Sequence, residues 1–189
     1  MPMPISFKPT EIDAVWEVNA GVFEDDRGFF MEAYNAATWT EAGFTEPFLQ
    51  DNVSTSKRGT LRGLHYQLEP HGMGKLVRAM KGSIFDVAVD IRQGSPTFGK
   101  WVGRTLSAEN KLALWVPSGF AHGFIALEDD SMVWYKCTST HAPESERSIR
   151  YNDPAIGIDW GIEPEVISDK DAVAPLLAEA EYNFAYTGG

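Results

Sequence analysis

The stretch KLVRAMKGSIFDVAVDI, residues 75–91, contains two short segments rich in valine, isoleucine and phenylalanine, separated by the turn-forming residues KGS. Apolar and polar side chains alternate in the second segment, and a period of two residues is typical of a β-strand. Residues 75–91 therefore predict two consecutive strands joined by a tight turn.

The second of these segments, residues 83–91, has two different faces. In an extended chain its mostly apolar and its mostly acidic side chains point to opposite sides: Phe85, Val87, Val89 and Ile91 against Asp86, Ala88 and Asp90. Two explanations stay open at this point. The strand has one face in solvent, or it contributes Asp86 to a polar barrel interior.

Similar segments recur along the rest of the chain, and Gly, Pro, Asn or Asp residues occupy the gaps between them. They are WVGRTL at 101–106, KLALWVP at 111–117, HGFIAL at 122–127 and SMVWYKC at 131–137. Several short strands at this spacing predict an all-β sandwich or barrel. A helical pattern occurs mainly at 36–43 and at 171–184, where Pro175 would interrupt or begin a helix. Both helices are expected at the periphery.

The composition is that of a folded protein with a single domain over residues 1–189. Hydrophobic residues make up 43% and charged residues 23% of the chain, away from the composition of disordered proteins. The net charge of −11 disfavours nucleic acid and anionic lipid as partners. An anionic ligand would need a local cluster of arginine and lysine.

The chain is expected to be cytoplasmic and to have no contact with a membrane. No segment approaches the roughly 20 consecutive apolar residues that span a bilayer, and the first residues do not resemble an export signal. The single cysteine, Cys137, cannot form a disulfide within the chain, which fits a reducing compartment. No Cys and His spacing is typical of a zinc site.

Among the residues that could do chemistry, His65 is the most informative. It lies in RGTLRGLHYQ, close in sequence to Arg58 and Arg62, and Lys75 follows after a turn rich in glycine. Neighbouring positive charge disfavours a protonated imidazole, which would favour a general base at neutral pH. A structural histidine is nevertheless the more common explanation for such a residue taken alone, so both explanations stay open.

A set of segments in fixed order carries a family resemblance over nearly the whole chain. The segments are DDRGFF at 25–30, QDN at 50–52, LRGLHYQ at 61–67, GKLVRAMKGSIFDVAVDIRQGSPTFGKW at 74–101, WVPSGFAHGF at 115–124, YKCT at 135–138, ERSIRYNDPAIGIDW at 146–160 and SDKDA at 168–172. In these segments the chain resembles the dTDP-4-dehydrorhamnose 3,5-epimerase family. The resemblance implies a cupin-type jelly-roll barrel and favours Asp86 in a polar interior.

The implied reaction inverts C3 and C5 of dTDP-4-dehydro-6-deoxy-D-glucose, on either side of its ketone, and yields dTDP-4-dehydro-L-rhamnose. A hydrogen next to a carbonyl is weakly acidic, so this isomerase needs a base, a stabiliser of the enolate oxygen and an acid. The resemblance assigns the base to His65, its orienting partner to Asp171 with Asp169 as competitor, the stabiliser to Lys75 and the acid to Tyr135.

The resemblance also implies a set of substrate-binding residues. Arg62 and Arg27 would hold the diphosphate, with Arg27 reaching the site of a neighbouring subunit. The remaining candidates for contacts with the nucleotide, the sugar or the site's interior are Phe29, Gln50, Asn52, Asp86, His122 and His141. After YKCT many relatives carry a pair of tyrosines, whereas this chain has Ser139, Thr140 and His141. Specificity is therefore more affected than the basic reaction: the alternatives are a preference for another nucleotide and epimerisation at a single carbon.

No metal and no cofactor is expected. Metal-dependent cupins carry an HxH pair in their first motif, whereas the corresponding residues here are His65, Tyr66 and Gln67. The family is typically homodimeric with an exchanged N-terminal strand, for which Phe7–Val18 is the candidate. The alternatives are an epimerase acting at C3 or C5 alone, a non-catalytic cupin that binds a sugar nucleotide, and a metal-dependent cupin.

Overall fold

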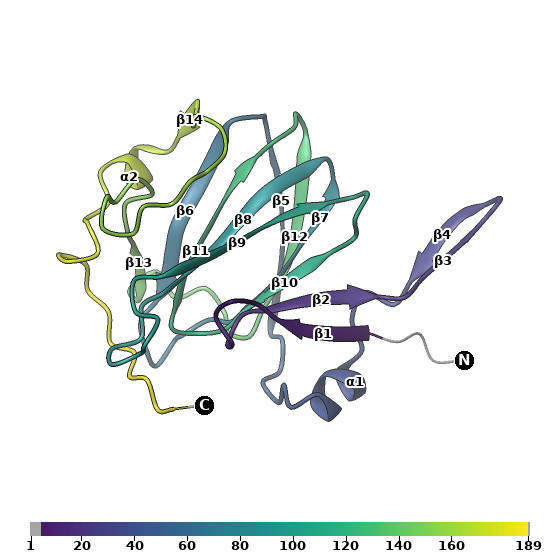
Figure 1. Ribbon diagram of the computed structural model, residues 1–189, viewed down its shortest axis with the longest axis horizontal. Helices are drawn as coiled ribbons and strands as arrows, with labels where there is room; N and C mark the ends of the chain where they lie inside the picture. The colour runs from purple at the N-terminus through teal and green to yellow at the C-terminus, as the bar shows by residue number, and fades with distance from the viewer. Residues whose placement is uncertain (1–4, 189) are drawn as a thin grey trace.

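Two β-sheets packed face to face form the body of the protein in the computed structural model, which describes residues 5–188 (Figure 1). The first sheet has the strand order β1 (Ile5–Pro9), β2 (Trp16–Ala20), β10 (Ala113–Val116), β7 (Lys75–Lys81), β12 (Ser131–Cys137) and β5 (Gln50–Ser56). The second has the order β13 (Glu146–Ser148), β6 (Thr60–Gln67), β11 (Phe120–Ala126), β8 (Ser83–Asp90) and β9 (Trp101–Ser107), and β14 (Val166–Ile167) runs parallel to β6.

From β5 to β13 consecutive strands change sheets, as in a jelly roll, except that β8 and β9 pair with each other in the second sheet. Residues 75–91 form the two expected strands, but β7 belongs to the first sheet and β8 to the second, so they do not make a hairpin. Gly82 lies between them with a φ of 65°, a conformation that glycine adopts at little cost. The expectation of an all-β, cupin-type jelly roll with short peripheral helices is confirmed. The predicted single domain, residues 1–189, includes residues 1–4 and 189, which lie outside the described residues.

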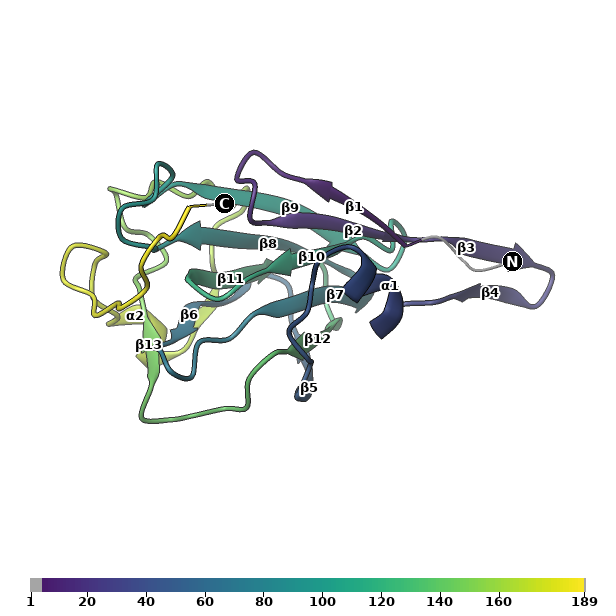
Figure 2. The same cartoon turned by 90° about the horizontal axis from the view of Figure 1, so that it is seen from below.

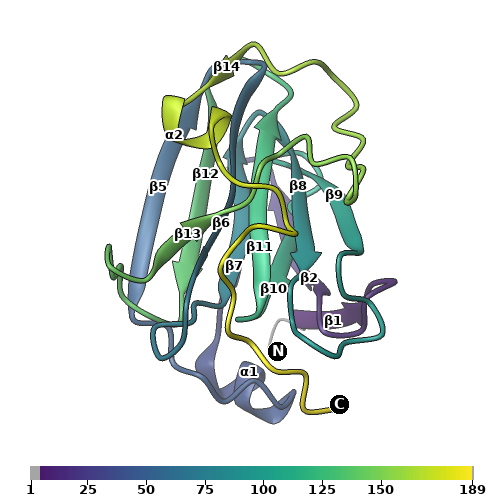
Figure 3. The ribbon, with the colours of Figure 1, turned by 90° about the vertical axis from the view of Figure 1, so that its left-hand side faces the viewer.

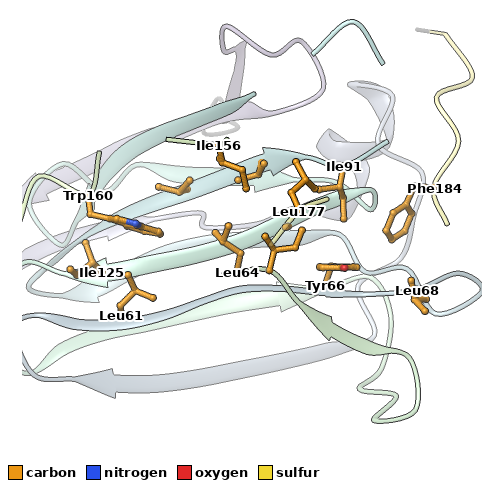
Figure 4. Close-up of a cluster of buried hydrophobic side chains, with 14 residues drawn as sticks. Leu61, Leu64, Tyr66, Leu68, Ile91, Ile125, Ile156, Trp160, Leu177 and Phe184 are labelled. Atoms are coloured by element: carbon orange, nitrogen blue, oxygen red, sulfur yellow. The ribbon is translucent and has the colours of Figure 1, made fainter. Parts of the chain in front are cut away.

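Both faces of β8 are buried, so the explanation that placed one face in solvent is wrong. Ile84 and Ala88 pack between the sheets against residues of β7 and β12, and Asp86, on the same face, is fully buried. The opposite face, with Val87 and Val89, is covered by the chain that follows β13. Figure 4 shows this second cluster, which joins Ile156, Trp160, Leu177 and Phe184 of the C-terminal part to Leu61, Leu64, Ile91 and Ile125. Asp86 therefore lies in the barrel interior, as the second explanation placed it. This interior is apolar around Ile84 and Ala88 and polar at the Asp86–His122 pair.

The first predicted helix forms and the second is largely absent. Helix α1 (Ala36–Glu41) is capped by the Asn35 side chain, which accepts hydrogen bonds from two backbone N–H groups. Its buried Trp39 packs against Trp115 of the first sheet.

Helix α2 (Asp169–Ala172) includes only Asp171 and Ala172 of the second predicted region. The Arg150 backbone N–H and side chain donate to the carbonyls of Pro175 and Ala174, which draws the chain away from a helix. The apolar residues beyond Pro175 then bury themselves by lying along the second sheet, as Leu177 and Phe184 do. Tertiary packing thus overrides the local helical pattern.

A hairpin of β3 (Val22–Asp25) and β4 (Gly28–Met31) projects from the body and is called the arm below (Figures 1 and 2). Its rings of Phe23, Phe29 and Phe30 are 55%, 55% and 69% exposed. The segment Phe7–Val18, the candidate for exchange, contributes to β1 and β2, and β2 lies between β1 and β10 in the first sheet. Its exchange with a second chain stays a prediction. The part of the N-terminal region that leaves the body is the arm. No helix among residues 5–188 is long and apolar enough to cross a bilayer.

Candidate active site

A cleft lies between the two sheets and is lined by residues of β5, β6, β12 and β13. Figure 3 shows the arrangement of these four strands. The cleft consists of two adjoining hollows of about 450 and about 310 Å³. The larger extends toward β14 and α2, and the smaller toward the beginning of β5. Three residues line both hollows and so stand at their junction: His65, Lys75 and Tyr135.

His65 on β6 forms a dyad with Asp171. The two side chains lie 2.6 Å apart, between the imidazole Nε2 and the carboxylate Oδ1. The backbone N–H of Gly63 donates to the other carboxylate oxygen at 3.3 Å. The Asp171 side chain is 4% exposed and that of His65 is 31% exposed, so the dyad is fixed from inside while the imidazole reaches the cleft. Asp169, the competing candidate, is exposed.

The carboxylate of Asp171 is held in its ionised form. Burial by itself would raise the pKa of Asp171, but the hydrogen bond and charge of His65 and the Gly63 N–H outweigh burial and lower this pKa. An ionised, buried carboxylate fixes the orientation of the imidazole and stabilises it once it has taken a proton. The other ring nitrogen of His65 is then available to act as a base.

The lowered pKa of Asp171 predicts how its contribution to stability depends on pH. A carboxyl group whose pKa is lower in the folded state stabilises the fold above its unfolded pKa of about 3.9, and this contribution disappears as pH falls through the folded pKa. We expect wild type to exceed Asp171→Asn in free energy of unfolding by about 1–3 kcal/mol at neutral pH. Urea unfolding from pH 7 to pH 2 should show this difference vanish only below about pH 4. A difference independent of pH would contradict it.

Gly63, two residues before His65, allows two strands to approach closely. Its φ is 137°, and a Cβ there would lie 2.5 Å from Cα of Gly123 on β11. We expect Gly63→Ala to lower the free energy of unfolding by about 1–3 kcal/mol, since overpacking and backbone strain act together. Thermal unfolding checks this value. Gly161→Ala is the matched control, because Gly161 also has a positive φ but open space around its Cα.

The opposite wall of the cleft carries Tyr135 and Lys75. In the pairing of β12 with β7, Tyr135 lies opposite Val77 and Cys137 lies opposite Lys75, so these side chains share the inner face. Burial raises the pKa of the Tyr135 hydroxyl, which therefore carries a proton at neutral pH. Burial also lowers the pKa of Lys75, and the nearby Cys137 and Asp86 oppose this change.

Beneath the cleft, Asp86 and His122 form a second pair of carboxylate and imidazole. His122 Nε2 lies 2.8 Å from Asp86 Oδ1, and the side chains are 8% and 0% exposed. Burial lowers the pKa of His122 despite the opposing effect of Asp86, so this imidazole is neutral. His122 pairs with His65 across β11 and β6 and lines the larger hollow. Oδ2 of Asp86 has no hydrogen-bond partner among residues 5–188.

The other sequence-based candidates divide into two groups. Arg62 lines the larger hollow, and Gln50, Asn52 and His141 line the smaller one. The Gln50 amide donates to Asn52 at 3.0 Å and accepts from the His141 backbone N–H at 2.9 Å. Two candidates are not brought together with the rest: Arg27 and Phe29 lie on the arm.

Sequence reasoning gave no role to several residues that line the cleft. They are Ser54, Thr60, Phe124, Glu146, Ser168 and Lys170. Nζ of Lys170 lies 2.6 Å from Oε1 of Glu146, although the two residues are 24 positions apart in the sequence. Both occur in segments quoted for the family resemblance, and Lys170 is the neighbour of Asp171. The position of Lys170 next to Asp171 was the sequence signal that could have identified it as a residue of the cleft.

The family model described as dTDP-4-dehydrorhamnose 3,5-epimerase matches residues 9–179. The chain belongs to this epimerase family. A dTDP-4-dehydrorhamnose 3,5-epimerase from Shigella flexneri is 51% identical over 174 residues, which cover 92% of this chain and 96% of the relative.

Solved structures of sugar-nucleotide epimerases are similar to this chain. The epimerase from Legionella pneumophila, in complex with dTDP-4-keto-L-rhamnose, matches this epimerase with a TM-score of 0.90 and 49% identity, covering 93% of this chain and 94% of that one. A 3'-monoepimerase from Streptomyces bikiniensis, in complex with dTDP-quinovose, matches with a TM-score of 0.85 and 38% identity, covering 90% and 87%.

Within residues 5–188 of this epimerase, no three His, Cys, Asp or Glu side chains are grouped so as to hold a metal ion. At the positions of the HxH motif, His65 is bonded to Asp171, the Tyr66 hydroxyl donates to the carbonyl of Glu181, and Gln67 donates to the carbonyl of His71. Each of these side chains thus has a partner within the chain. That the epimerase works without a metal or cofactor stays a prediction.

Proposed function

We propose that this epimerase, acting as a single domain, inverts C3 and C5 of dTDP-4-dehydro-6-deoxy-D-glucose and forms dTDP-4-dehydro-L-rhamnose. The observation that carries the proposal is the placement of His65 and Tyr135 on opposite walls of the cleft, where both line both hollows. A sugar ring between them presents one face to a base and the other to an acid. Inversion requires this arrangement, because the proton must return from the side opposite to its removal.

In the proposed reaction, His65 removes the proton from a carbon next to the ketone, and the electrons of that C–H bond move onto the ketone oxygen. The ammonium group of Lys75 stabilises the resulting enolate, and its charge is effective because the side chain is partly shielded from solvent in the cleft. Tyr135 then gives its hydroxyl proton to the same carbon from the opposite face. The sequence repeats at the other carbon next to the ketone after His65 and Tyr135 have exchanged protons with solvent.

We further propose that Arg62 binds the diphosphate and that Gln50, Asn52 and His141 contact the nucleoside. Arg62 is oriented by its hydrogen bonds to Ser56 and to the carbonyl of Thr55. Local cations are needed here because the chain carries a net charge of −11. Asp86 supports the site from below through His122.

The test is proton NMR of the purified protein with dTDP-4-dehydro-6-deoxy-D-glucose in deuterated water. Deuterium at both C3 and C5, together with a rhamno product, is the expected result. The His65→Ala protein is the control for exchange that the enzyme does not catalyse. No exchange with wild type at either carbon would overturn the proposed substrate.

Epimerisation at a single carbon is the second candidate. It is supported by the match to the 3'-monoepimerase from Streptomyces bikiniensis and by His141, which occupies the smaller hollow where many relatives carry tyrosine. The same NMR experiment decides between the candidates, because deuterium would then enter one carbon only.

We also propose that the protein acts as a homodimer in which each arm reaches the cleft of its partner. The arm places Arg27 and Phe29 away from the cleft of their own chain, and it exposes phenylalanine rings that would be stabilised by contact with a second copy. Under this arrangement one site contains residues of two chains.

A complementation experiment tests the shared site. Arg27→Ala should lower kcat/KM about 100-fold, the loss of one phosphate-binding arginine. Unfolding and refolding an equimolar mixture of Arg27→Ala and His65→Ala chains should restore about one-quarter of wild-type activity, since half of the dimers are mixed and each has one complete site. Arg58→Ala, an exposed arginine that lines neither hollow, is the control. No recovery in the mixture would show that Arg27 acts within its own chain.

A further inference from the structure

The arm is held to the body of its own chain near the loop that joins β9 to β10. Nζ of Lys111 in this loop lies 3.6 Å from Oε1 of Glu24 on β3 and 4.8 Å from the ring centroid of Phe29 on β4. The Arg78 guanidinium donates to Sδ of Met31, where β4 ends. Within residues 5–188, every hydrogen bond, ion pair and ring contact between the arm and the body involves Lys111 or Arg78.

Local hydrogen bonds fix the backbone of this loop. The Asn110 side chain accepts from the backbone N–H groups of Ser107 and Leu112, each at 3.0 Å, and donates to the carbonyl of Thr105 at 2.8 Å. Lys111 follows with a φ of 55°, a left-handed conformation that lysine seldom adopts. Its side chain is only 17% exposed. The loop therefore presents the Lys111 ammonium group to the arm from a fixed position.

Arg78 on β7 connects this loop to the first sheet. It is 1% exposed, and its guanidinium donates to the carbonyl of Lys111 as well as to Met31. Its Nε and Nη2 have no hydrogen-bond partner within residues 5–188, so these two contacts are the ones that orient it. Burial lowers the pKa of Arg78 to about 10, and the group is still charged at neutral pH. The loop and the base of the arm thus share one buried cation.

A small tilt at the base of the arm displaces its tip by a large amount. Arg27 lies in the turn at the tip, far from the body, and Met31 lies at the base (Figures 1 and 2). At roughly 3.3 Å per residue in a strand, the tip is about 13 Å from the base, so a tilt of about 10° moves Arg27 by about 2 Å. A displacement of about 1 Å is enough to lower the rate of an enzyme strongly. The contacts at the base therefore decide where Arg27 arrives.

We infer that Lys111 is a positioning residue for the cleft of the partner: it sets the direction of the arm, so that Arg27 reaches the diphosphate bound by the second chain. The inference rests on the proposed homodimer with a shared site. Lys111 lines neither hollow of the cleft in its own chain. Its ion pair and its contact with an aromatic ring are of kinds that contribute little to global stability. Lys111 therefore matters for substrate binding and much less for folding.

The test compares Lys111→Met with Lys100→Met in the full chain. Methionine keeps an unbranched side chain at the left-handed backbone position but removes the charge that attracts Glu24 and Phe29. Lys100 is an exposed lysine that lines neither hollow. Lys111→Met should raise the Kd for dTDP and lower kcat/KM, each about tenfold, while kcat stays within about twofold of wild type, because a phosphate contact acts mainly on binding. Lys100→Met should leave these values unchanged, and Lys111→Arg, which keeps the charge, should retain at least about half of wild-type kcat/KM.

A double variant distinguishes positioning from a general structural effect. If Lys111 acts through Arg27, combining Lys111→Met with Arg27→Ala should lower kcat/KM no further than Arg27→Ala alone. Two effects that multiply would contradict the inference, because Lys111 would then act independently of Arg27.

A second measurement depends neither on activity nor on a ligand. Hydrogen exchange followed by mass spectrometry reports the protection of the amides of residues 22–31 in the free protein. These amides should exchange at least about fivefold faster in Lys111→Met than in wild type, Lys111→Arg or Lys100→Met, since the arm loses its contact with the body. The amides of β7 and β12 should keep their wild-type protection, which shows that the fold is intact.

The outcomes separate this inference from the proposed function. Wild-type exchange of the arm together with a wild-type Kd in Lys111→Met would overturn the inference. Faster exchange with unchanged Kd and kcat/KM would also overturn it, since the arm would then reach its place without Lys111. If Arg27→Ala kept wild-type activity, the shared site would fail, whereas faster exchange of residues 22–31 in Lys111→Met would still show that Lys111 holds the arm.

Discussion

His65→Ala should lower kcat by about 1,000-fold, because the variant lacks the base for proton removal at both C3 and C5. Asp171 cannot replace it: its side chain is 4% exposed and lies behind the imidazole. Substrate should still bind, since Arg62, Gln50 and Asn52 remain in place, so the Kd for dTDP should change little. Product formation by NMR and dTDP titration by calorimetry measure the two effects separately.

The matched control for His65→Ala is His71→Ala. His71 also lies near a carboxylate, with Nε2 at 3.7 Å from Glu144, but it lines neither hollow of the cleft. Its removal should leave kcat within about twofold of wild type, as for most surface substitutions. A His65→Ala protein that folds and retains a tenth or more of wild-type turnover would rule out His65 as the base.

The strands could be predicted because their signal is local. Alternation along residues 83–91 follows directly from the two-residue period of an extended chain. The partner of each strand could not be predicted in this way: β7 and β8 are consecutive, yet they join different sheets. The apolar face of β8 also packs outward, against Trp160 and other residues of the C-terminal part, rather than between the sheets (Figure 4).

The C-terminal region shows why a local pattern fails when packing competes with it. Residues 171–184 have helical spacing, but Leu177 and Phe184 bury more apolar surface by lying along the second sheet than an isolated short helix would allow. Pro175 also interrupts the backbone hydrogen bonds that a longer helix would need. Of these residues only Asp171 and Ala172 are helical, in the capped turn Asp169–Ala172.

The site depended on the family resemblance, because its parts are distant in sequence. His65 and Asp171 are 106 residues apart, and no periodicity brings them together. Glu146 and Lys170 were overlooked for a physical reason: acidic and basic side chains are most often solvated, so neither residue type signals a site by itself. Only the folded structure shows that both residues line the cleft, because β13 and α2 both contact strand β6.

Tyr135→Phe should separate proton exchange from inversion. The variant keeps His65, Asp171 and Lys75, so the proton next to the ketone can still be removed and the enolate stabilised. Without the hydroxyl on the opposite wall, the carbon can regain a proton only from His65, on the face from which it left. His65 is 31% exposed and can exchange with solvent in the meantime, so substrate in deuterated water should gain deuterium without changing configuration.

The rate of inversion in Tyr135→Phe should fall about 100- to 1,000-fold, the usual contribution of one general acid. NMR distinguishes this outcome from simple inactivation, because deuterated substrate with retained stereochemistry forms only if the base still works. Tyr151→Phe is the matched control, since that hydroxyl lies outside both hollows of the cleft. Inversion in Tyr135→Phe at a rate close to wild type would show that the proton comes from another donor. His122 and Lys75 would then be the residues to substitute, because both line the larger hollow.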